Sequence, residues 1–342
     1  MQTKERKRKI LKAIVEEYVK SGEPVGSKLL VNTLGFPVSS ATIRNEMAEL
    51  SEMGLLTQPH TSAGRQPSED GFRYYVEHLM DKKTLSGSTK ALILNELSSK
   101  GDDPEKLLSA AGEVASELLE TVCVTTTPFS ENARIRTLRF VQTGRQTCMV
   151  VLITSTGLIK TKLFKCDYVI TPDIVNIYET IFNREMEGLP VKSVTPAYIQ
   201  TQAVSLGEIA MLVPSVLSAI MDACREVGGF SMTVTGRTAL LDREDDVLGM
   251  RALTQLLHSD EQLETLLLRL RTGKNILIGS ETGNEALADH SFIAEPYTIE
   301  PTSGGFITAI VPMRYDYAYA SAVLQYVAEC SGRLLREILM IE

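Results

Sequence analysis

One short predicted helix carries most of the side chains that suit chemistry with a partner, within the stretch SSATIRNEMAEL at residues 39–50. Its small or hydrogen-bonding side chains are Ser39, Ser40, Ala41, Thr42, Arg44 and Asn45. Small residues allow close approach to DNA, arginine pairs with guanine, asparagine pairs with adenine, and hydroxyl groups suit phosphates. Because a reading helix enters the major groove by its N-terminal end, this order predicts contacts with base edges. A solvated polar face without a partner is the alternative.

The loop that follows, PHTSAGRQPS, holds a second group of candidate contacts. They are His60, Thr61, Ser62 and Arg65, and they stand between two prolines. An arginine and hydroxyl groups in such a loop can reach the sugar-phosphate backbone or the minor groove. An ordinary hairpin loop would have the same composition, so the prolines do not separate the two interpretations.

The first twelve residues form a basic end on an acidic chain. Residues 1–80 hold 11 Lys and Arg against 10 Asp and Glu, whereas the other 262 residues hold 24 against 33. The net charge of −8 therefore conceals a division that suits a regulator with one DNA-facing end. Lys7 and Lys9 are the candidate DNA contacts in this segment. A charged terminus that only improves solubility is the alternative.

Helical and strand patterns predict the scaffold that holds these residues. The expected elements are helices at 4–20, 27–34 and 39–53, a strand at 55–59, its return at 66–68, and a fourth helix capped by Ser68. Ile43, Met47 and Leu50 fall on one side of the third helix, so they should pack against the first two helices. Three helices followed by a strand pair is the order of a winged helix-turn-helix.

The rest of the chain has the pattern of a sheet domain with an insertion. Strand patterns on both sides flank the mostly helical residues 172–272, and a helix over 317–340 closes the chain. The predicted fold class is therefore α+β with several domains. The expected boundaries are 1–80 for the winged helix, 81–120 for a helical linker, 121–167 and 273–342 for the sheet domain, and 168–272 for the insert.

Composition and motifs argue against several classes. Of 342 residues, 44% are hydrophobic and 23% charged, as in ordinary globular proteins, and no run of 18 apolar residues suggests a membrane span. Five scattered cysteines without a CxxC pair indicate a reduced, cytoplasmic protein. The four histidines lack metal-ligand spacing, and there is no Walker A or GxSxG motif. No metal, cofactor or enzyme activity is therefore predicted.

A ligand-sensing regulator is the second function class that the sequence leaves open. The GGF stretch at 304–306 and Tyr297 could line a pocket in the sheet domain, although a packed interior is the other outcome. The stretch GSETGNE at 279–285 also contains glycines, and its pattern is more typical of a turn after a strand. Stabilisation by metabolites rather than by DNA would favour this class.

Longer motifs give a more specific indication. SSATIRNEM, GLLTQPHTSAGRQP and GFRYYV stand in register between Gly26 and Val76, and GGFITAIVPMRYDYAYASAVLQYVAE follows near the end. Together they resemble the signatures of the bacterial heat-inducible transcription repressor HrcA family. The family's usual Gly-Pro-x-Arg-Met-x-Tyr run reads VPMRYDY here, and Gln66 and Ser68 replace its usual aliphatic residue and Thr.

The resemblance implies three parts: a winged helix, a GAF-like domain, and an inserted dimerisation domain that interrupts the GAF-like sheet. It implies a homodimer that binds an inverted-repeat operator of the CIRCE type upstream of chaperone operons. It also implies that the GroEL chaperonin keeps the repressor active, so that repression lapses when heat diverts the chaperonin to unfolded proteins.

The stretch at 206–224 is the expected place of the dimer interface within the insert. Its apolar residues exceed one helical face, and Pro214 bends or splits the helix. A buried core helix is the alternative. A two-fold dimer would present two reading helices to half-sites of opposite orientation, which suits an inverted repeat.

Overall fold

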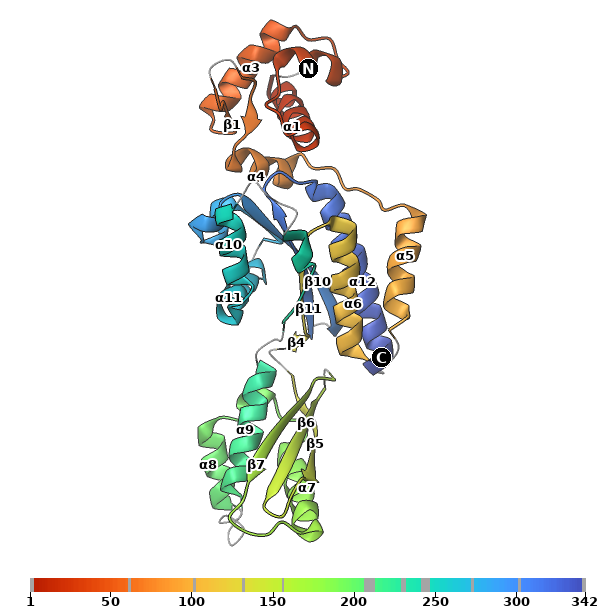
Figure 1. Ribbon diagram of the computed structural model, residues 1–342, viewed down its shortest axis with the longest axis vertical. Helices are drawn as coiled ribbons and strands as arrows, with labels where there is room; N and C mark the ends of the chain where they lie inside the picture. The colour runs from red at the N-terminus through yellow and green to blue at the C-terminus, as the bar shows by residue number, and fades with distance from the viewer. Residues whose placement is uncertain are drawn as a thin grey trace.

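The computed structural model describes residues 3–60, 63–100, 103–130, 133–155, 157–205, 213–228, 232–240, 247–271, 274–300 and 303–339. The molecule is elongated, and three units follow one another along its long axis (Figure 1). The N-terminal helices form one end, a sheet with helices forms the middle, and a second sheet forms the other end. This mixture of helices and antiparallel sheets agrees with the predicted α+β class.

The N-terminal unit contains four helices and one antiparallel strand pair within its described residues. Its elements are α1 (Thr3–Ser21), α2 (Ser27–Thr33), α3 (Ser40–Glu52), β1 (Leu56–Thr57), β2 (Gln66–Pro67) and α4 (Glu69–His78). Ile43, Met47 and Leu50 of α3 are buried, as their spacing predicts. Gly35 and Gly54 have φ angles of +62° and +78°, which L side chains rarely adopt, so glycine suits the ends of α2 and α3.

The middle unit is built on a six-stranded antiparallel sheet. Its strands are β3 (Val122–Thr126), β4 (Phe129–Ser130), β8 (Met232–Thr235), β9 (Ile276–Ile278), β10 (His290–Glu300) and β11 (Ser303–Pro312). The order is β8-β3-β11-β10-β9, and β4 pairs with the end of β11. Strands from before and after residues 135–228 therefore share one sheet, so the intervening segment is an insertion into it.

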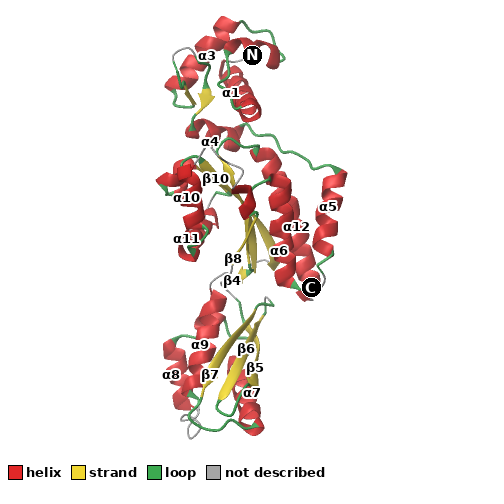
Figure 2. Ribbon diagram, viewed as in Figure 1, coloured by secondary structure: helices red, strands yellow, loops and turns green. Residues whose placement is uncertain are grey.

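Helices cover both faces of this sheet (Figure 2). They are α5 (Gly87–Ser98), α6 (Pro104–Leu119) and α12 (Tyr317–Leu339) on one side, and α10 (Val247–Leu256) and α11 (Asp260–Arg271) on the other. Ile307 and Ala309 of β11 pack with α6 and α12, whereas Phe306 and Ile310 pack with α10 and α11. Because both faces are covered, β11 is buried along nearly its whole length, including its polar residues Ser303 and Thr308. The segment 81–120, expected as a linker, contributes α6 to the core.

The GGF stretch packs closely around Tyr297 of β10. A Cβ at Gly304 would lie 2.0 Å from the Tyr297 carbonyl oxygen, and one at Gly305 would lie 2.5 Å from the Tyr297 hydroxyl. That hydroxyl donates a hydrogen bond to the Thr126 carbonyl at 2.5 Å. The two glycines therefore serve close packing within the sheet, which is the second of the two outcomes that the sequence left open for this stretch.

The unit at the far end has its own sheet and its own core. It contains β5 (Ile135–Gln142), β6 (Thr147–Thr154), β7 (Ile159–Lys165), α7 (Pro172–Met186), α8 (Pro196–Ser205) and α9 (Pro214–Gly228). A short 3-10 helix at Val191–Ser193 also belongs to this unit. Three others follow strands of the middle sheet, at Arg237–Leu240, Gly279–Thr282 and Glu285–Leu287. The insert, expected to begin at residue 168, shares its core with β5, β6 and β7.

The helix α9 includes most of the described part of the expected interface at 206–224. Residues 206–212 of that stretch lie outside the described part of the chain. Its apolar side chains Val216, Leu217, Ile220 and Val227 are all buried in the core of the same unit. The described part of this stretch is thus a core helix, which was the alternative interpretation.

The helix α4 attaches the N-terminal unit to the middle unit through polar side chains. Ser280 donates hydrogen bonds from its backbone N and its hydroxyl to Glu69 Oε1, at 3.1 and 2.5 Å. Arg73 Nε donates to Glu281 Oε1 at 2.9 Å, and a second Arg73 nitrogen donates to the Ile276 carbonyl at 2.7 Å. Burial alone would raise the pKa of Glu281, but hydrogen bonds, led by the one from Arg73, lower it. We call these contacts of Glu69 and Arg73 the α4 joint.

Apolar packing continues across the α4 joint. Phe72 of α4 is 2% exposed, and its ring centroid lies 6.0 Å from that of Tyr317 and 6.3 Å from that of Tyr18. One cluster of buried residues accordingly extends from α1 through α4 to α12. A Cβ at Gly279, which has a φ angle of +51°, would lie 2.7 Å from Glu69 Oε2. The stretch GSETGNE is therefore a turn after a strand, as its pattern indicates. It also forms the surface that α4 contacts through Glu69 and Arg73.

Candidate nucleic-acid interface

The N-terminal end of α3 carries the exposed part of the predicted reading surface. Ser39 caps the helix, because its hydroxyl accepts a hydrogen bond from Thr42 N at 3.1 Å. The Thr42 hydroxyl lies 2.8 Å from Ser39 Oγ, so the two side chains hold each other in place. Ala41, Arg44 and Asn45 are exposed. The cap thus fixes the helix end while the amide and guanidinium groups face solvent.

Two contacts place the start of α2 and the loop beside this helix end. Ser40 Oγ lies 2.9 Å from Ser27 Oγ in the first turn of α2. Val25 and Arg65 exchange backbone hydrogen bonds of 2.8 and 2.9 Å, which attach the loop to the turn before α2. The candidate residues of α3 and of the loop are therefore connected through α2.

The loop between β1 and β2 is shaped by contacts of its described residues. Ala63 N donates to the His60 carbonyl at 2.9 Å, and Gln58 Nε2 donates to the Ala63 carbonyl at 3.0 Å. A Cβ at Gly64 would lie 2.4 Å from the Val25 carbonyl oxygen, so the attachment of the loop to the α2 turn requires glycine.

The candidate residues of the loop differ in exposure. His60 is exposed, whereas Arg65 is half-buried. Arg65 Nε is buried and has no hydrogen-bond partner within the described part of the chain. Such a group is stabilised when an acceptor reaches it. The candidates Thr61 and Ser62 lie outside the described residues.

Two cations of the basic N-terminal segment form ion pairs with α3. Arg6 Nε donates to Glu46 Oε1 at 2.9 Å, and the Glu46 side chain is only 4% exposed. Lys7 pairs with Glu49, and the hydrogen bond that the Lys7 ammonium donates to this carboxylate raises the pKa of the ammonium. A DNA contact by Lys7 stays a prediction, and it requires Lys7 to leave Glu49 or to be shared with it.

Three further cations of α1 also have partners. The contacts are Arg8 with the His78 carbonyl at 2.9 Å, Lys12 with Asp81, and Lys9 with Glu5 at 3.4 Å and with the Phe36 ring at 5.8 Å. Neither interpretation of the basic end anticipated this arrangement. Most of these charges hold α1 against α3 and against the residues around the end of α4.

The start of α2 holds a surface cation that the motif search missed. Lys28 is exposed and directly follows Ser27, the residue that contacts Ser40. The available signal was its position in the first turn after Gly26, which precedes α2. This lysine adds positive charge next to the N-terminal ends of both α2 and α3.

The described residues were also searched for features of other protein classes. No group of three His, Cys, Asp or Glu side chains in that part of the chain has a geometry that could hold a metal ion. Within the same ranges, each helix is too short or too polar to cross a lipid bilayer. The five cysteines are buried and free.

The arrangement defines a class of protein. A capped helix end with exposed amide and guanidinium groups, next to a second helix start and a glycine-dependent loop, suits the regulators that place one helix against nucleic acid.

Similar proteins specify the family within this class. A model of the HrcA protein C terminal domain matches residues 105–320. The chain is 31% identical to the heat-inducible transcription repressor HrcA of Carboxydothermus hydrogenoformans, over 97% of this chain and 98% of that protein. It is also 31% identical to the protein of the same name from Shouchella clausii, over 92% of each chain. The chain therefore belongs to the heat-inducible transcription repressor HrcA family.

A solved structure gives a further match. The crystal structure of a hypothetical protein aligns with a TM-score of 0.61 and 25% sequence identity, over 97% of this chain and 98% of that chain.

We predict that the cations of α1 differ in their structural importance. Arg6→Met should lower the free energy of unfolding by about 3 kcal/mol, because it leaves the buried Glu46 carboxylate without its partner. Lys7→Met is the matched control and should have little effect, because the Glu49 side chain is 53% exposed. Urea unfolding followed by circular dichroism measures both. Equal stability of the two variants would contradict the assigned pairing.

Proposed function

We propose that the chain is a transcription repressor that binds an inverted-repeat operator of the CIRCE type as a homodimer, without catalytic activity. The observation that carries the proposal is the exposed N-terminal end of α3, held by the Ser39 cap beside α2. Asn45 suits adenine, Arg44 suits guanine, and the hydroxyl groups with the helix N-terminus suit phosphates. The family supports the role of repressor, since its relatives carry that name.

In this proposal α1 to α3 with β1 and β2 form a winged helix-turn-helix, and the loop between the strands is the wing. The half-buried Arg65 is the candidate wing contact to the sugar-phosphate backbone, and His60, Thr61 and Ser62 are further candidates from the same loop sequence. Lys9 and Lys7 would add phosphate contacts. Residues 81–342 carry a net charge of −9, which disfavours contact of DNA with the rest of the surface.

We infer the following division of the chain. Residues 1–80 form the winged helix, and the sheet of β3, β4 and β8 to β11 with its helices is the GAF-like domain. The predicted boundary of the insert is revised to about 133–228, because β5, β6 and β7 share one core with α7 and α9. The α4 joint supports a rigid connection between the first two parts.

The open face of the sheet β5-β6-β7 is the proposed dimer surface. The helices α7 and α9 pack on the face that holds Leu138, Val150 and Phe164. The opposite face carries side chains in matching cross-strand positions, namely Val141, Met149, Val151, Ile153, Ile159 and Leu163. Leu163 is 65% exposed and Ile159 is 57% exposed. Arg139 and Thr161 flank Val151 on this face, between an apolar row that ends at Leu163 and an apolar pair that ends at Ile159. Exposed apolar surface of this kind favours burial against a partner.

A second copy of this chain is the partner that suits the open face. Two copies of one apolar face complement each other in a two-fold arrangement, in which the same patch is used on both sides. A two-fold axis along the long axis of the molecule would place both α3 helices at the same end (Figure 1). Joining two weak DNA contacts in this way can raise overall affinity by roughly 10²–10⁴.

Chaperonin dependence is the part of the proposal that comes from the family resemblance. If the dimer is marginally stable, heat lowers its active fraction, and GroEL restores it by refolding misfolded chains. The test is operator affinity of denatured chain refolded with and without GroEL, its cochaperonin and ATP. We expect a larger active fraction with the chaperonin. Equal active fractions would contradict this part of the proposal.

We predict that Asn45→Ala and Arg44→Ala each weaken operator binding by about 1–3 kcal/mol, because each removes one base contact. Asn95→Ala is the matched control, since Asn95 is exposed on α5, away from the proposed interface. Fluorescence anisotropy at one fixed salt concentration, with inverted-repeat and scrambled duplexes, provides the measurement. Unchanged affinity in both α3 variants would show that the reading surface is elsewhere.

We predict that Leu163→Lys dissociates the dimer, because it places a charge in the exposed apolar row of Val141, Met149 and Leu163. The matched control is Ile177→Lys, since Ile177 is 42% exposed on α7 and lies outside the open face. Light scattering after size-exclusion chromatography gives the mass of each variant. A Leu163→Lys variant that remains a dimer would rule out this face as the interface.

A further inference from the structure

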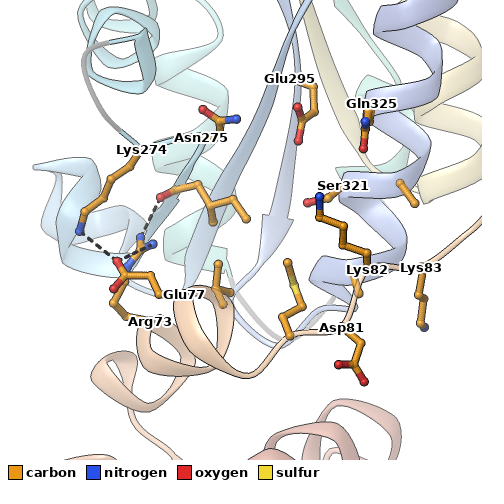
Figure 3. A pocket seen from close by; sticks show the side chains of 15 residues that line it. Arg73, Glu77, Asp81, Lys82, Lys83, Lys274, Asn275, Glu295, Ser321 and Gln325 are labelled. Atoms are coloured by element: carbon orange, nitrogen blue, oxygen red, sulfur yellow. Dashed lines mark hydrogen bonds and ion pairs between the residues drawn. The ribbon is translucent and has the colours of Figure 1, made fainter.

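A solvent-accessible cavity of about 490 Å³ lies where the α4 joint meets the middle unit (Figure 3). Its walls come from α4 and the segment after it, from the β9 and β10 region, and from α12. The apolar part of the lining is Val76, Met80, Ile276, Ala318 and Ala322. This volume falls within the range of about 300–1,000 Å³ that is usual for small-molecule sites.

Most charged groups around the cavity already have partners. Glu281 accepts hydrogen bonds from Arg73 and Lys274, both at 2.9 Å. Asp81 pairs with Lys12, and Lys83 pairs with Asp316 at 2.5 Å. A ligand would therefore have to break an existing pair to use any of these groups.

Two opposite charges on the cavity lining have no such partner. Within the described part of the chain, the side chains of Lys82 and Glu295 form no hydrogen bond and no ion pair within 4 Å. Figure 3 shows the two side chains directed into the same space, with Ser321 and Gln325 beside them. Lys82 belongs to the segment after α4, whereas Glu295 belongs to β10. An amine and a carboxylate from two segments far apart in the chain thus face one space.

The surroundings of Glu295 favour a cationic group of a ligand at this position. Burial and the nearby Glu329 of α12 raise the pKa of the Glu295 carboxyl to about 7, although the Lys82 charge acts in the opposite direction. A carboxyl in this position is stabilised in its ionised form when a cation reaches it. Lys82 is exposed to solvent, whereas Glu295 is half-buried. A cation alone would use only Glu295, and an anion alone would use only Lys82. A ligand that carries both charges would use the two groups together.

We propose that this cavity binds a small zwitterion of the α-amino-acid class. The ligand's ammonium group lies against Glu295, its carboxylate lies against Lys82, and the Ser321 hydroxyl adds a hydrogen bond. Its side chain contacts the apolar wall around Val76 and Met80. The site is separate from the proposed DNA surface, and an occupant would connect the segment after α4 to β10.

Calorimetric titration of the full-length chain with the common amino acids tests the proposal, and no variant is needed. The tightest amino acid is then compared with its decarboxylated amine and with its deaminated acid. We expect both analogues to bind at least about tenfold more weakly, because each lacks one of the two charges. An amine or acid that binds as tightly as the amino acid, or no heat with any amino acid at millimolar concentration, overturns the proposal.

Variants of the two charged residues give a second readout. Lys82→Met should reduce the affinity for the amino acid at least about tenfold and leave the affinity for the amine unchanged. Glu295→Gln should also reduce the affinity for the amino acid at least about tenfold, but it should leave the affinity for the deaminated acid unchanged. Lys83→Met is the matched control and should retain affinity, because Lys83 is paired with Asp316. Loss of binding that is equal for Lys82→Met and Lys83→Met would overturn the assignment. Binding should also strengthen from pH 6 to pH 8 as Glu295 ionises, and the opposite trend counts against the site.

Discussion

The contact on which the rest of the structure depends is the α4 joint. Arg73 and Glu69 bind the turn Gly279–Thr282, which lies more than 200 residues later in the chain. Phe72 of the same helix packs against Tyr317 at the start of α12, so that polar and apolar contacts lie side by side. Removing one partner of the α4 joint would expose both the polar and the apolar contacts to water. The N-terminal unit and the middle unit are therefore coupled in stability. The unit that carries α3 is thus part of one continuous core rather than a separate module on a linker.

Charge is distributed in a way that net charge does not reveal. The cations of α1 suggest a DNA-binding tip in the sequence, yet Arg6 and Lys7 pair with acids of α3. These pairs fix the angle between the two helices and remove much of the positive charge from solvent. The exposed cations at this end include Arg44 at the α3 N-terminus and Lys28 of α2, besides Lys4, Arg8 and Lys9 of α1. A DNA contact at this end would rely on the orientation of α3 and on hydrogen bonds at least as much as on total charge.

Local patterns predicted α3 and its buried stripe, because both depend on residues within four positions of one another. The strands β5 and β6 were also predictable as strands, but their separation from β3 was not, since pairing between strands is a long-range choice. The partners of Arg6 and Arg73 are 40 and 208 residues away, so no spacing rule could identify them. For the same reason GSETGNE could be read only as a turn. The cavity beside Glu295 was also hidden, because its lining comes from segments far apart in the chain.

The continuous core has a consequence for how a dimer could read an operator. If the reading unit were attached by a flexible linker, the two α3 helices would sample many separations, and the effective concentration of the second contact would fall with linker length. The α4 joint leaves little of this freedom, since polar and apolar contacts both restrain α4. The separation of the two helices would then be set by the dimer surface at the far end of the molecule and carried through the middle unit. A small change in the packing of the middle unit would therefore alter the spacing of the half-sites that both copies can contact together.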